Sequence, residues 1–437
     1  MIERLLNQFK NNTFLVASLY SGFAAISKIL SAVIIAKIVA IILGPEGLAL
    51  IGQLNSFILL SITLAGTAIS QGIVKYVAQY AKEDITKLNT MIGVSLKIIV
   101  SSSLLLAILL IIFSSVLSSY ILLDAKYYFV FILLGCTILL SGFNSLFTSV
   151  LNGFKQFKKF NQITIISNLF GLFITVLLIY FYHIEGVLIS LALNQTVIFF
   201  VTYFYIRKEP WYAVRKFYEM PFHKGIGIDL LKYAALSLFS TILVPIVTIL
   251  IRKIIINEES LTAAGYYEFM LRISSVTLMF FSIMISTYYI PRISEIFTVK
   301  ELKKEVINTY KIIIPLLIVI LGGIFVCRYF IIKLLATEDF MLVSPMFTWQ
   351  LLADFFKVSA QIISFILVAK ALIKLAIVVE VIFNVTNFTL CYLLIPIYGY
   401  KVVFIINLVM CLSYFIAFIL IYKFVILNVK KHNILKE

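Results

Sequence analysis

Long apolar runs, separated by short polar and charged clusters, fill almost the whole sequence. Most runs reach or exceed the ~20 residues that an α-helix needs to cross the hydrocarbon layer of a bilayer. The runs are continuous rather than alternating, so the pattern favours helices over the strands of a transmembrane barrel. It predicts twelve transmembrane helices, at residues 14–43, 48–80, 88–118, 127–153, 160–182, 184–206, 231–256, 261–291, 305–328, 341–370, 374–396 and 399–423.

The composition excludes a water-soluble fold. Hydrophobic residues make up 62% of the 437 residues and charged residues 13%, whereas soluble domains have about 45–50% and about 25%. A soluble protein could not cover so much apolar side chain with polar surface. We therefore predict an all-α polytopic membrane protein.

Basic residues indicate which loops face the cytoplasm. Lys and Arg concentrate in the two terminal segments and in every second loop, and the other loops contain few of them. Under the positive-inside rule, both termini are then cytoplasmic. The formal charge of +16 belongs to this face, where it suits anionic headgroups, and it requires no nucleic-acid partner.

The longest polar connection lies in the middle of the chain and is predicted to be cytoplasmic. It separates six predicted helices from six. The predicted organisation is an N-terminal six-helix bundle at 1–207, a cytoplasmic linker at 208–230 and a C-terminal six-helix bundle with a cytoplasmic tail at 231–437.

The two predicted bundles look like repeats of one unit. Gly47 and Gly265 occur at the turns that follow the first and seventh helices, and Gly186 and Gly399 occur near the turns that precede the sixth and twelfth. Both pairs are separated by about half the chain, which supports an internal duplication. Because each half has an even number of helices, we expect parallel repeats related by a pseudo-two-fold axis along the membrane normal.

Seven charged residues form a candidate site because they fall deep inside the predicted helices. A charge at the bilayer centre costs about 2.5–3.5 kcal/mol on insertion scales, so it normally faces a water-filled path or a partner. We expect the cations to bind substrate, and the anions to couple to an ion or to form ion pairs in the cavity. The cations are Lys28, Lys37, Arg272 and Lys357, and the anions are Glu268, Asp354 and Glu380.

Four of these residues form two acid–base pairs at helical spacing. Glu268 and Arg272 are four residues apart, and Asp354 and Lys357 are three apart, so each pair lies on one face of its helix. Two interpretations remain open for each pair. The residues are either internal ion pairs that only stabilise helix packing, or groups along a substrate path.

The two lysines of the first helix, Lys28 and Lys37, have no such acid nearby. That isolation favours a substrate or proton role for at least one of them. Glu380, Asn384 and Asn387 form a polar stripe on the eleventh helix. Since the deep cations outnumber the deep anions, the predicted cavity is positive and suits an anionic substrate better than a cationic drug.

Five segments, in the same order along the chain, resemble a known family. They are ASLYSGFAAISKILSAVIIAKIVAIILGPEGLAL at 17–50, GIVKYVAQY at 72–80, IRKIIINEE at 251–259, YYIPRISEI at 288–296 and FTWQLLADFFKVSAQIISFILVAKA at 347–371. They resemble the Wzx-type flippases of O-antigen and enterobacterial common antigen (lipid III). These belong to the polysaccharide transporter branch of the multidrug/oligosaccharidyl-lipid/polysaccharide (MOP) exporter superfamily.

The resemblance implies a MOP-type fold in the bacterial cytoplasmic (inner) membrane. It also implies that the chain moves an undecaprenyl-diphosphate-linked oligosaccharide repeat unit to the periplasmic leaflet by alternating access. The implied partners are this substrate, membrane lipids, and a polysaccharide polymerase with its chain-length regulator. Lys28, Lys37, Asp354, Lys357 and Glu380 fall where the family has similar residues, and H+ or Na+ coupling through a deep acid is a further hypothesis.

Two other functions are compatible with a polytopic membrane protein. An ion-coupled multidrug antiporter of the same superfamily would need an acidic cavity, and the deep charges here are mostly basic. A membrane-embedded polysaccharide polymerase or ligase would need large outer loops, and the predicted ones are short. No nucleotide-binding, nucleophile or metal-ligand motif is present, so we expect a transporter with no catalytic residue, metal or cofactor.

Overall fold

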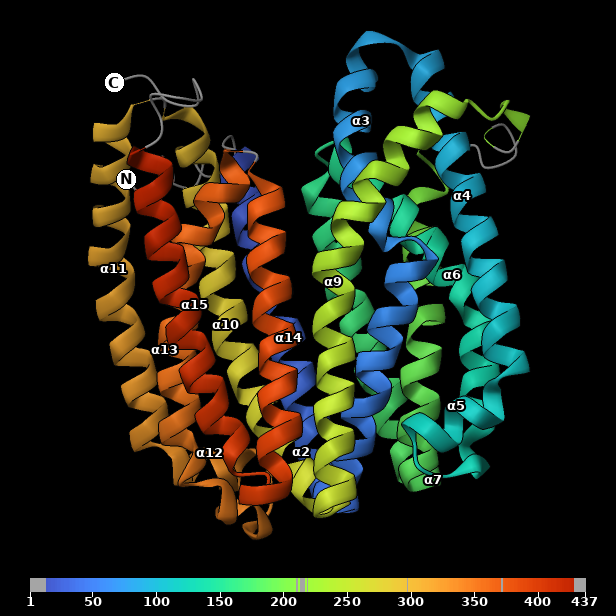
Figure 1. The fold of residues 1–437 in the computed structure, drawn as a ribbon. Coiled ribbons are helices and arrows are strands. Elements are labelled where there is room, and N and C mark those ends of the chain that lie inside the picture. Colours follow the sequence, from blue (N-terminus) through green and yellow to red (C-terminus); the bar gives the residue numbers. More distant parts are fainter. Residues whose placement is uncertain are drawn as a thin grey trace, which may run out of the picture. The chain divides into compact units, whose positions relative to one another are not determined.

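The computed structural model describes residues 13–209, 211–212, 217, 219–296, 298–370 and 372–427. Helices dominate these residues (Figure 1). The elements of the first half are α2 (Thr13–Ala65), η1 (Thr67–Ile69), α3 (Ser70–Glu83), α4 (Ile85–Ile112), α5 (Ser114–Ile121), η2 (Ala125–Tyr127), α6 (Tyr128–Gly153) and α7 (Phe157–Ile206). Those of the second half are α9 (Lys224–Glu258), α10 (Leu261–Glu295), α11 (Val299–Val326), α12 (Arg328–Leu335), η3 (Glu338–Val343), α13 (Met346–Ala369), α14 (Ile373–Tyr398) and α15 (Val402–Leu427).

The helices match the predicted membrane crossings. Nine helices of the described residues are long and apolar enough to cross a membrane. Two of them, α2 and α7, each contain a residue with non-helical backbone, Gly44 and His183 respectively, so that each merges two crossings. With α9, which is 35 residues long, the described helices provide the twelve predicted crossings.

The two sharp turns fall where the sequence predicts the short outer loops. Gly44 has φ +62°, a left-handed conformation that favours glycine, and Pro45 follows it. His183 has φ +48° and is exposed, as expected for a residue in a short loop. Three residues later, a Cβ on Gly186 would lie 1.9 Å from the Leu178 carbonyl oxygen. The turn therefore requires glycine at this position.

Side-chain caps begin several helices. Asp84 accepts hydrogen bonds from the backbone N–H groups of Thr86 and Lys87 at the start of α4, and Ser260 accepts one from Ala263 at the start of α10. Such caps satisfy donors that a helix leaves unpaired at its first turn. They explain why these helices begin at the polar clusters between apolar runs.

The second predicted helix, 48–80, is interrupted, which its apolar pattern does not reveal. Gly66 ends α2, and the chain continues through η1 into α3. The freed carbonyl of Ala65 accepts hydrogen bonds from the hydroxyls of Ser102 (2.9 Å) and Ser103 (3.1 Å) on α4. A broken helix is tolerated within a membrane when neighbouring side chains satisfy the freed backbone groups.

Contacts divide the chain into two compact units. The first unit comprises Met1–Leu43 and Leu50–Ile246, and the second comprises Gly44–Ala49 and Val247–Glu437. The division falls inside α9, whose first residues pack into the core of the first unit through Leu230. The pseudo-two-fold axis and the bundle limits at 207 and 231 stay predictions.

The core of the first unit includes part of the central linker. Phe217 is buried, and a Cβ on Gly93 of α4 would lie 2.5 Å from the Phe217 carbonyl oxygen. Trp211 stacks on Phe154 with ring centroids 5.9 Å apart. These linker residues are therefore packed against helices.

In the second unit, α13 is the central helix. It packs against α10, α11, α14 and α15 (Figure 1), and more than half of its residues are buried. Phe347 and Ala353 on α13 are fully buried. Polar side chains on α13 are therefore held in the interior of the unit, where they need partners.

Candidate functional site

Three charged side chains meet in the interior of the second unit, between α9 and α10. Arg252 Nη2 lies 3.0 Å from Glu268 Oε2, and Arg272 Nε lies 3.0 Å from Glu268 Oε1. Arg252 is 2% exposed and Glu268 7%. The carboxylate therefore lies between two guanidinium groups, and we call these residues the Glu268 cluster.

The Glu268 cluster combines a prediction with a residue that the sequence did not reveal. The Glu268–Arg272 ion pair forms as its spacing indicated. Arg252, by contrast, lies inside the predicted helix 231–256 but is not among the predicted site residues. In the structure α9 continues to Glu258 and buries Arg252. A basic residue in one predicted helix and an acid in the next were the available signal. Helical spacing within one helix, however, does not identify a partner on another helix.

A second acid, Asp354, lies in a different environment between α10, α13 and α15. Its Oδ1 accepts hydrogen bonds from the Ser274 hydroxyl and from Gln350 Nε2 (3.0 Å). Gln350 Oε1 in turn accepts one from Asn407 Nδ2 at 3.3 Å. Asp354 is 1% exposed. We call Ser274, Gln350, Asp354 and Asn407 the Asp354 cluster.

The Asp354 cluster leaves one carboxylate oxygen unsatisfied. Asp354 Oδ2 is buried and accepts no hydrogen bond from any residue that the structure describes. The spacing of Asp354 and Lys357 made an ion pair one of two interpretations, but no salt bridge joins these two described residues. The Asp354 carboxylate is held by neutral donors, while Lys357 on the same helix is partly exposed.

Polar contacts continue between α10 and α13. The Ser282 hydroxyl donates to Gln361 Oε1 at 3.2 Å, two helical turns beyond the Ser274–Asp354 contact. Gln350, Asp354 and Gln361 therefore share one face of α13, and that face is turned towards α10.

The third deep acid, Glu380, is partly exposed on α14. Tyr414 Oη on α15 donates to Glu380 Oε2 at 2.8 Å, and Asn384 Nδ2 donates to Glu380 Oε1 at 3.3 Å. The predicted polar stripe on this helix thus forms contacts within the helix and with α15. All three deep acids of the second unit have a partner from at least one neighbouring helix.

The two deep lysines of α2 belong to the first unit. Lys28 is exposed and Lys37 is partly exposed. Beside Lys28, Ser27 Oγ accepts a hydrogen bond from Asn168 Nδ2 on α7 at 3.1 Å. The hydroxyl contacts thus hold α2 against α7, while the side chain of Lys28 remains accessible.

These side chains can hold an anion but offer little to a transition metal. The described residues contain no group of three or more His, Cys, Asp and Glu side chains that could hold a metal ion. Exposed or partly exposed ammonium and guanidinium groups are suitable partners for phosphate oxygens. Among the predicted cations these are Lys28, Lys37, Arg272 and Lys357.

Comparison with known proteins places the chain in a family. Residues 16–297 match the family described as polysaccharide biosynthesis protein. The chain belongs to this family. The chain is also 24% identical over 387 residues to the lipid III flippase of Escherichia coli (strain K12), covering 88% of this chain and 92% of the relative. The lipid III flippase of Shigella flexneri matches to the same extent. The resemblance inferred from the sequence segments is confirmed.

Similar solved structures identify the fold of the chain. An inward-facing multidrug resistance MATE family transporter of the MOP superfamily superposes with a TM-score of 0.79 at 15% identity, covering 93% of this chain and 96% of the other. The lipid II flippase MurJ in an inward closed conformation superposes with a TM-score of 0.72 at 16% identity, covering 94% and 87%. The prediction of an all-α, MOP-type, multi-pass membrane protein is confirmed.

Proposed function

We propose that this protein is a flippase for an undecaprenyl-diphosphate-linked oligosaccharide repeat unit of surface polysaccharide. It moves the repeat unit from the cytoplasmic to the periplasmic leaflet by alternating access. The observation that carries this proposal is the similarity to the lipid III flippase over 88% of the chain and 92% of the relative. So extensive a match involves both units rather than one module.

The accessible cations support an anionic substrate. A diphosphate cannot cross hydrocarbon unaided, and Lys and Arg are its natural partners. Lys28 is exposed on α2, and 23% of the Arg272 side chain is exposed even though its Nε contacts Glu268. Lys357 is partly exposed beside a carboxylate that it does not contact. In the proposed function these groups shelter the diphosphate while the prenyl chain stays in lipid.

We assign ion coupling, by H+ or Na+, to Asp354. Its Oδ2 is buried and has no hydrogen-bond partner in the described part of the chain, and its Oδ1 contacts are neutral. A carboxylate in this environment can gain stability from a proton or a small cation, whereas Glu268 already has two guanidinium partners. Transport that persists after both the proton and sodium gradients are collapsed would overturn this assignment.

The proposed orientation has both termini in the cytoplasm of a bacterial cell. We expect Lys126, in η2, to face the periplasm, and Lys87, at the start of α4, to face the cytoplasm. In a cysteine-free background, a membrane-impermeant maleimide should label Lys126→Cys but not Lys87→Cys in intact cells. The opposite labelling would show that the proposed orientation, and with it the proposed direction of transport, is wrong. A polymerase and its chain-length regulator are the proposed recipients of the product.

Complementation of a deletion strain tests the substrate. Without the gene, lipid-linked repeat units should accumulate in the cytoplasmic leaflet, and wild type should remove them. Lys28→Ala and Lys357→Ala should fail, while Lys87→Ala, an exposed lysine near Asp84, should complement fully. Normal surface glycan combined with new sensitivity to cationic drugs would instead favour the multidrug antiporter. If unpolymerised repeat units accumulate in the outer leaflet of the deletion strain, the result would favour a polymerase or ligase.

A further inference from the structure

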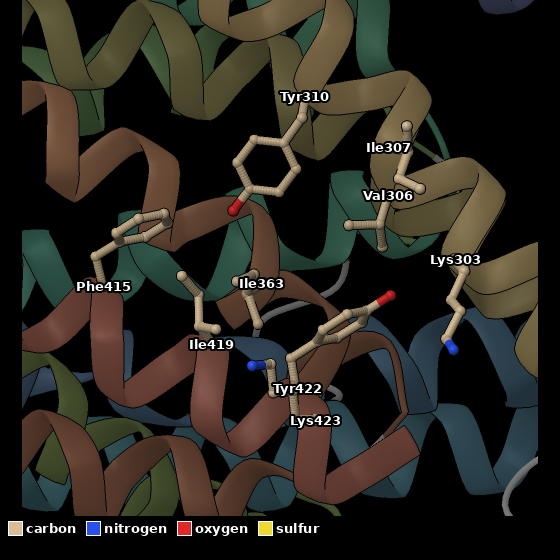
Figure 2. Close-up of a pocket in the computed structure, with 9 residues that line it drawn as sticks. All are labelled: Lys303, Val306, Ile307, Tyr310, Ile363, Phe415, Ile419, Tyr422 and Lys423. Carbon is tan, nitrogen blue, oxygen red and sulfur yellow. The ribbon is translucent and has the colours of Figure 1, made fainter. Parts of the chain in front are cut away.

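A cavity of about 570 Å³ lies in the second unit between α11, α13 and α15. Figure 2 shows the side chains that line it. The α11 side contributes Lys303, Val306, Ile307 and Tyr310, the α13 side contributes Ile363, and the α15 side contributes Phe415, Ile419, Tyr422 and Lys423. The cavity shares no residue with the Glu268 or Asp354 clusters.

The lining residues form two facing stripes at helical spacing. On α11 they recur at intervals of three or four residues from Lys303 to Tyr310, and on α15 they do so from Phe415 to Lys423. Both helices pack against α13, and Ile363 of α13, which is 3% exposed, lies between the stripes. The cavity is thus a groove with an apolar wall on three helices.

Polar groups mark one end of this groove. Lys303 and Lys423 are exposed, and neither forms an ion pair with a described residue. In the view of Figure 2 the Tyr422 ring lies between these two lysines, and Phe415 lies at the far side of the cavity. Lysine and tyrosine beside an apolar surface are typical of the boundary between hydrocarbon and headgroups.

We propose that this groove binds one anionic phospholipid, such as phosphatidylglycerol. Its phosphate lies at the end of the groove that Lys303, Tyr422 and Lys423 line, and an acyl chain lies along Ile307, Phe415 and Ile419. Basic pockets between transmembrane helices bind acidic lipid headgroups in this way, and the volume falls in the range of ligand sites. In the proposed orientation the headgroup belongs to the cytoplasmic leaflet. The lipid is a bound component rather than the transported substrate.

Native mass spectrometry of the full chain, titrated with phosphatidylglycerol in detergent, tests the site. Replacing both lysines (Lys303→Ala with Lys423→Ala) should weaken the first binding event by about fivefold per lysine removed. The matched control is Lys300→Ala with Lys304→Ala, because these exposed lysines lie at the same end of α11 but do not line the cavity. The control should bind as wild type does.

A second variant tests the apolar wall without changing charge. Ile419→Trp fills the groove and should weaken phosphatidylglycerol binding, while leaving binding of free glycerol phosphate unchanged. Thermal unfolding of each variant confirms that it is folded. Equal weakening in both lysine pairs, or unchanged binding in Ile419→Trp, would overturn the proposal.

Competition separates this site from the proposed transport path. Phosphatidylcholine should compete poorly with phosphatidylglycerol, because it carries no net negative charge. A polyprenyl diphosphate that displaces phosphatidylglycerol from wild type, but not from the Lys303/Lys423 variant, would show that the groove holds substrate and would overturn the assignment to a phospholipid. The readout is binding rather than transport, so it does not depend on the proposed function.

Discussion

Glu268 and Asp354 are both buried carboxyl groups in the second unit, but they have different neighbours. Glu268 contacts two guanidinium groups, one on its own helix and one on α9. Asp354 contacts a hydroxyl and an amide, and its second oxygen has no hydrogen-bond partner among the described residues. A buried carboxylate held by two cations strongly favours its ionised form. A buried carboxylate with one unsatisfied oxygen can instead bind and release a proton or a small cation. The comparison therefore supports our proposal that Glu268 stabilises the unit and that Asp354 couples transport to an ion.

Removing the charge of Glu268 should have the largest effect. Glu268→Gln removes the carboxylate that Arg252, which is 2% exposed, and Arg272 both contact, so we expect a loss of about 3–5 kcal/mol in unfolding free energy. Unfolding of the purified protein in detergent measures this loss. A variant as stable as wild type would show that Arg252 is compensated elsewhere, and the contrast with Asp354 would disappear.

Glu380 provides an intermediate case, because it is partly exposed and hydrogen-bonded. Tyr414→Phe removes the 2.8 Å hydrogen bond to Glu380 Oε2 and should cost about 2 kcal/mol, the typical value for a bond to a charged acceptor. The same unfolding assay applies. An effect as large as that of Glu268→Gln would mean that Tyr414 also has a major role in packing.

Asp354→Asn should change stability little, by about 1 kcal/mol, because an amide can keep the contacts of Oδ1 with Ser274 and Gln350. It should nevertheless abolish the dependence of transport on an ion gradient. Leaflet-resolved assays with and without an ionophore measure this dependence. A stable variant that remains gradient-dependent would move the coupling function to another acid.

The smallest effect is expected outside the membrane, at Glu209. Burial opposes ionisation of this side chain, but hydrogen bonds from Lys159 and Gln156 outweigh it and lower its pKa. Because the folded-state pKa lies below the ordinary 4.5, the stabilisation is present at neutral pH and is lost as the pH falls through the folded-state value. Lys159 is 41% exposed, so Glu209→Gln should cost about 0.5 kcal/mol.

The pH dependence of stability provides a control for the prediction at Glu209. The difference in melting temperature between wild type and Glu209→Gln should shrink as the pH is lowered below 4.5. A difference that grows on acidification would mean that the carboxyl group prefers its protonated form in the folded protein.

The apolar pattern predicted the helices well, because a chain in lipid must satisfy its backbone hydrogen bonds within each span. Helical spacing also predicted the contact between Glu268 and Arg272, which share one helix. It could not predict Arg252 as their partner, nor Ser274 as the partner of Asp354, because both contacts join different helices. Spacing fixes the face on which a residue lies but not the residue opposite.

The interruption at Gly66 shows the same limit within one apolar run. Nothing in the hydropathy of 48–80 distinguishes Gly66 from a helical residue. The break depends on Ser102 and Ser103 of another helix, whose hydroxyl groups donate hydrogen bonds to the Ala65 carbonyl. Only the tertiary structure shows that this carbonyl is satisfied.

The packed linker has a practical consequence for protein engineering. A long polar connection between helices is usually the first choice for inserting a fluorescent reporter or an epitope. Here Trp211 and Phe217 are part of the hydrophobic interior around Phe154 and Gly93. An insertion between Trp211 and Tyr212 would disturb the ring contacts that these two residues make with Phe154 and Phe147. Exposed Lys126, beside the short turn at η2, offers a position where a small tag disturbs fewer packed side chains.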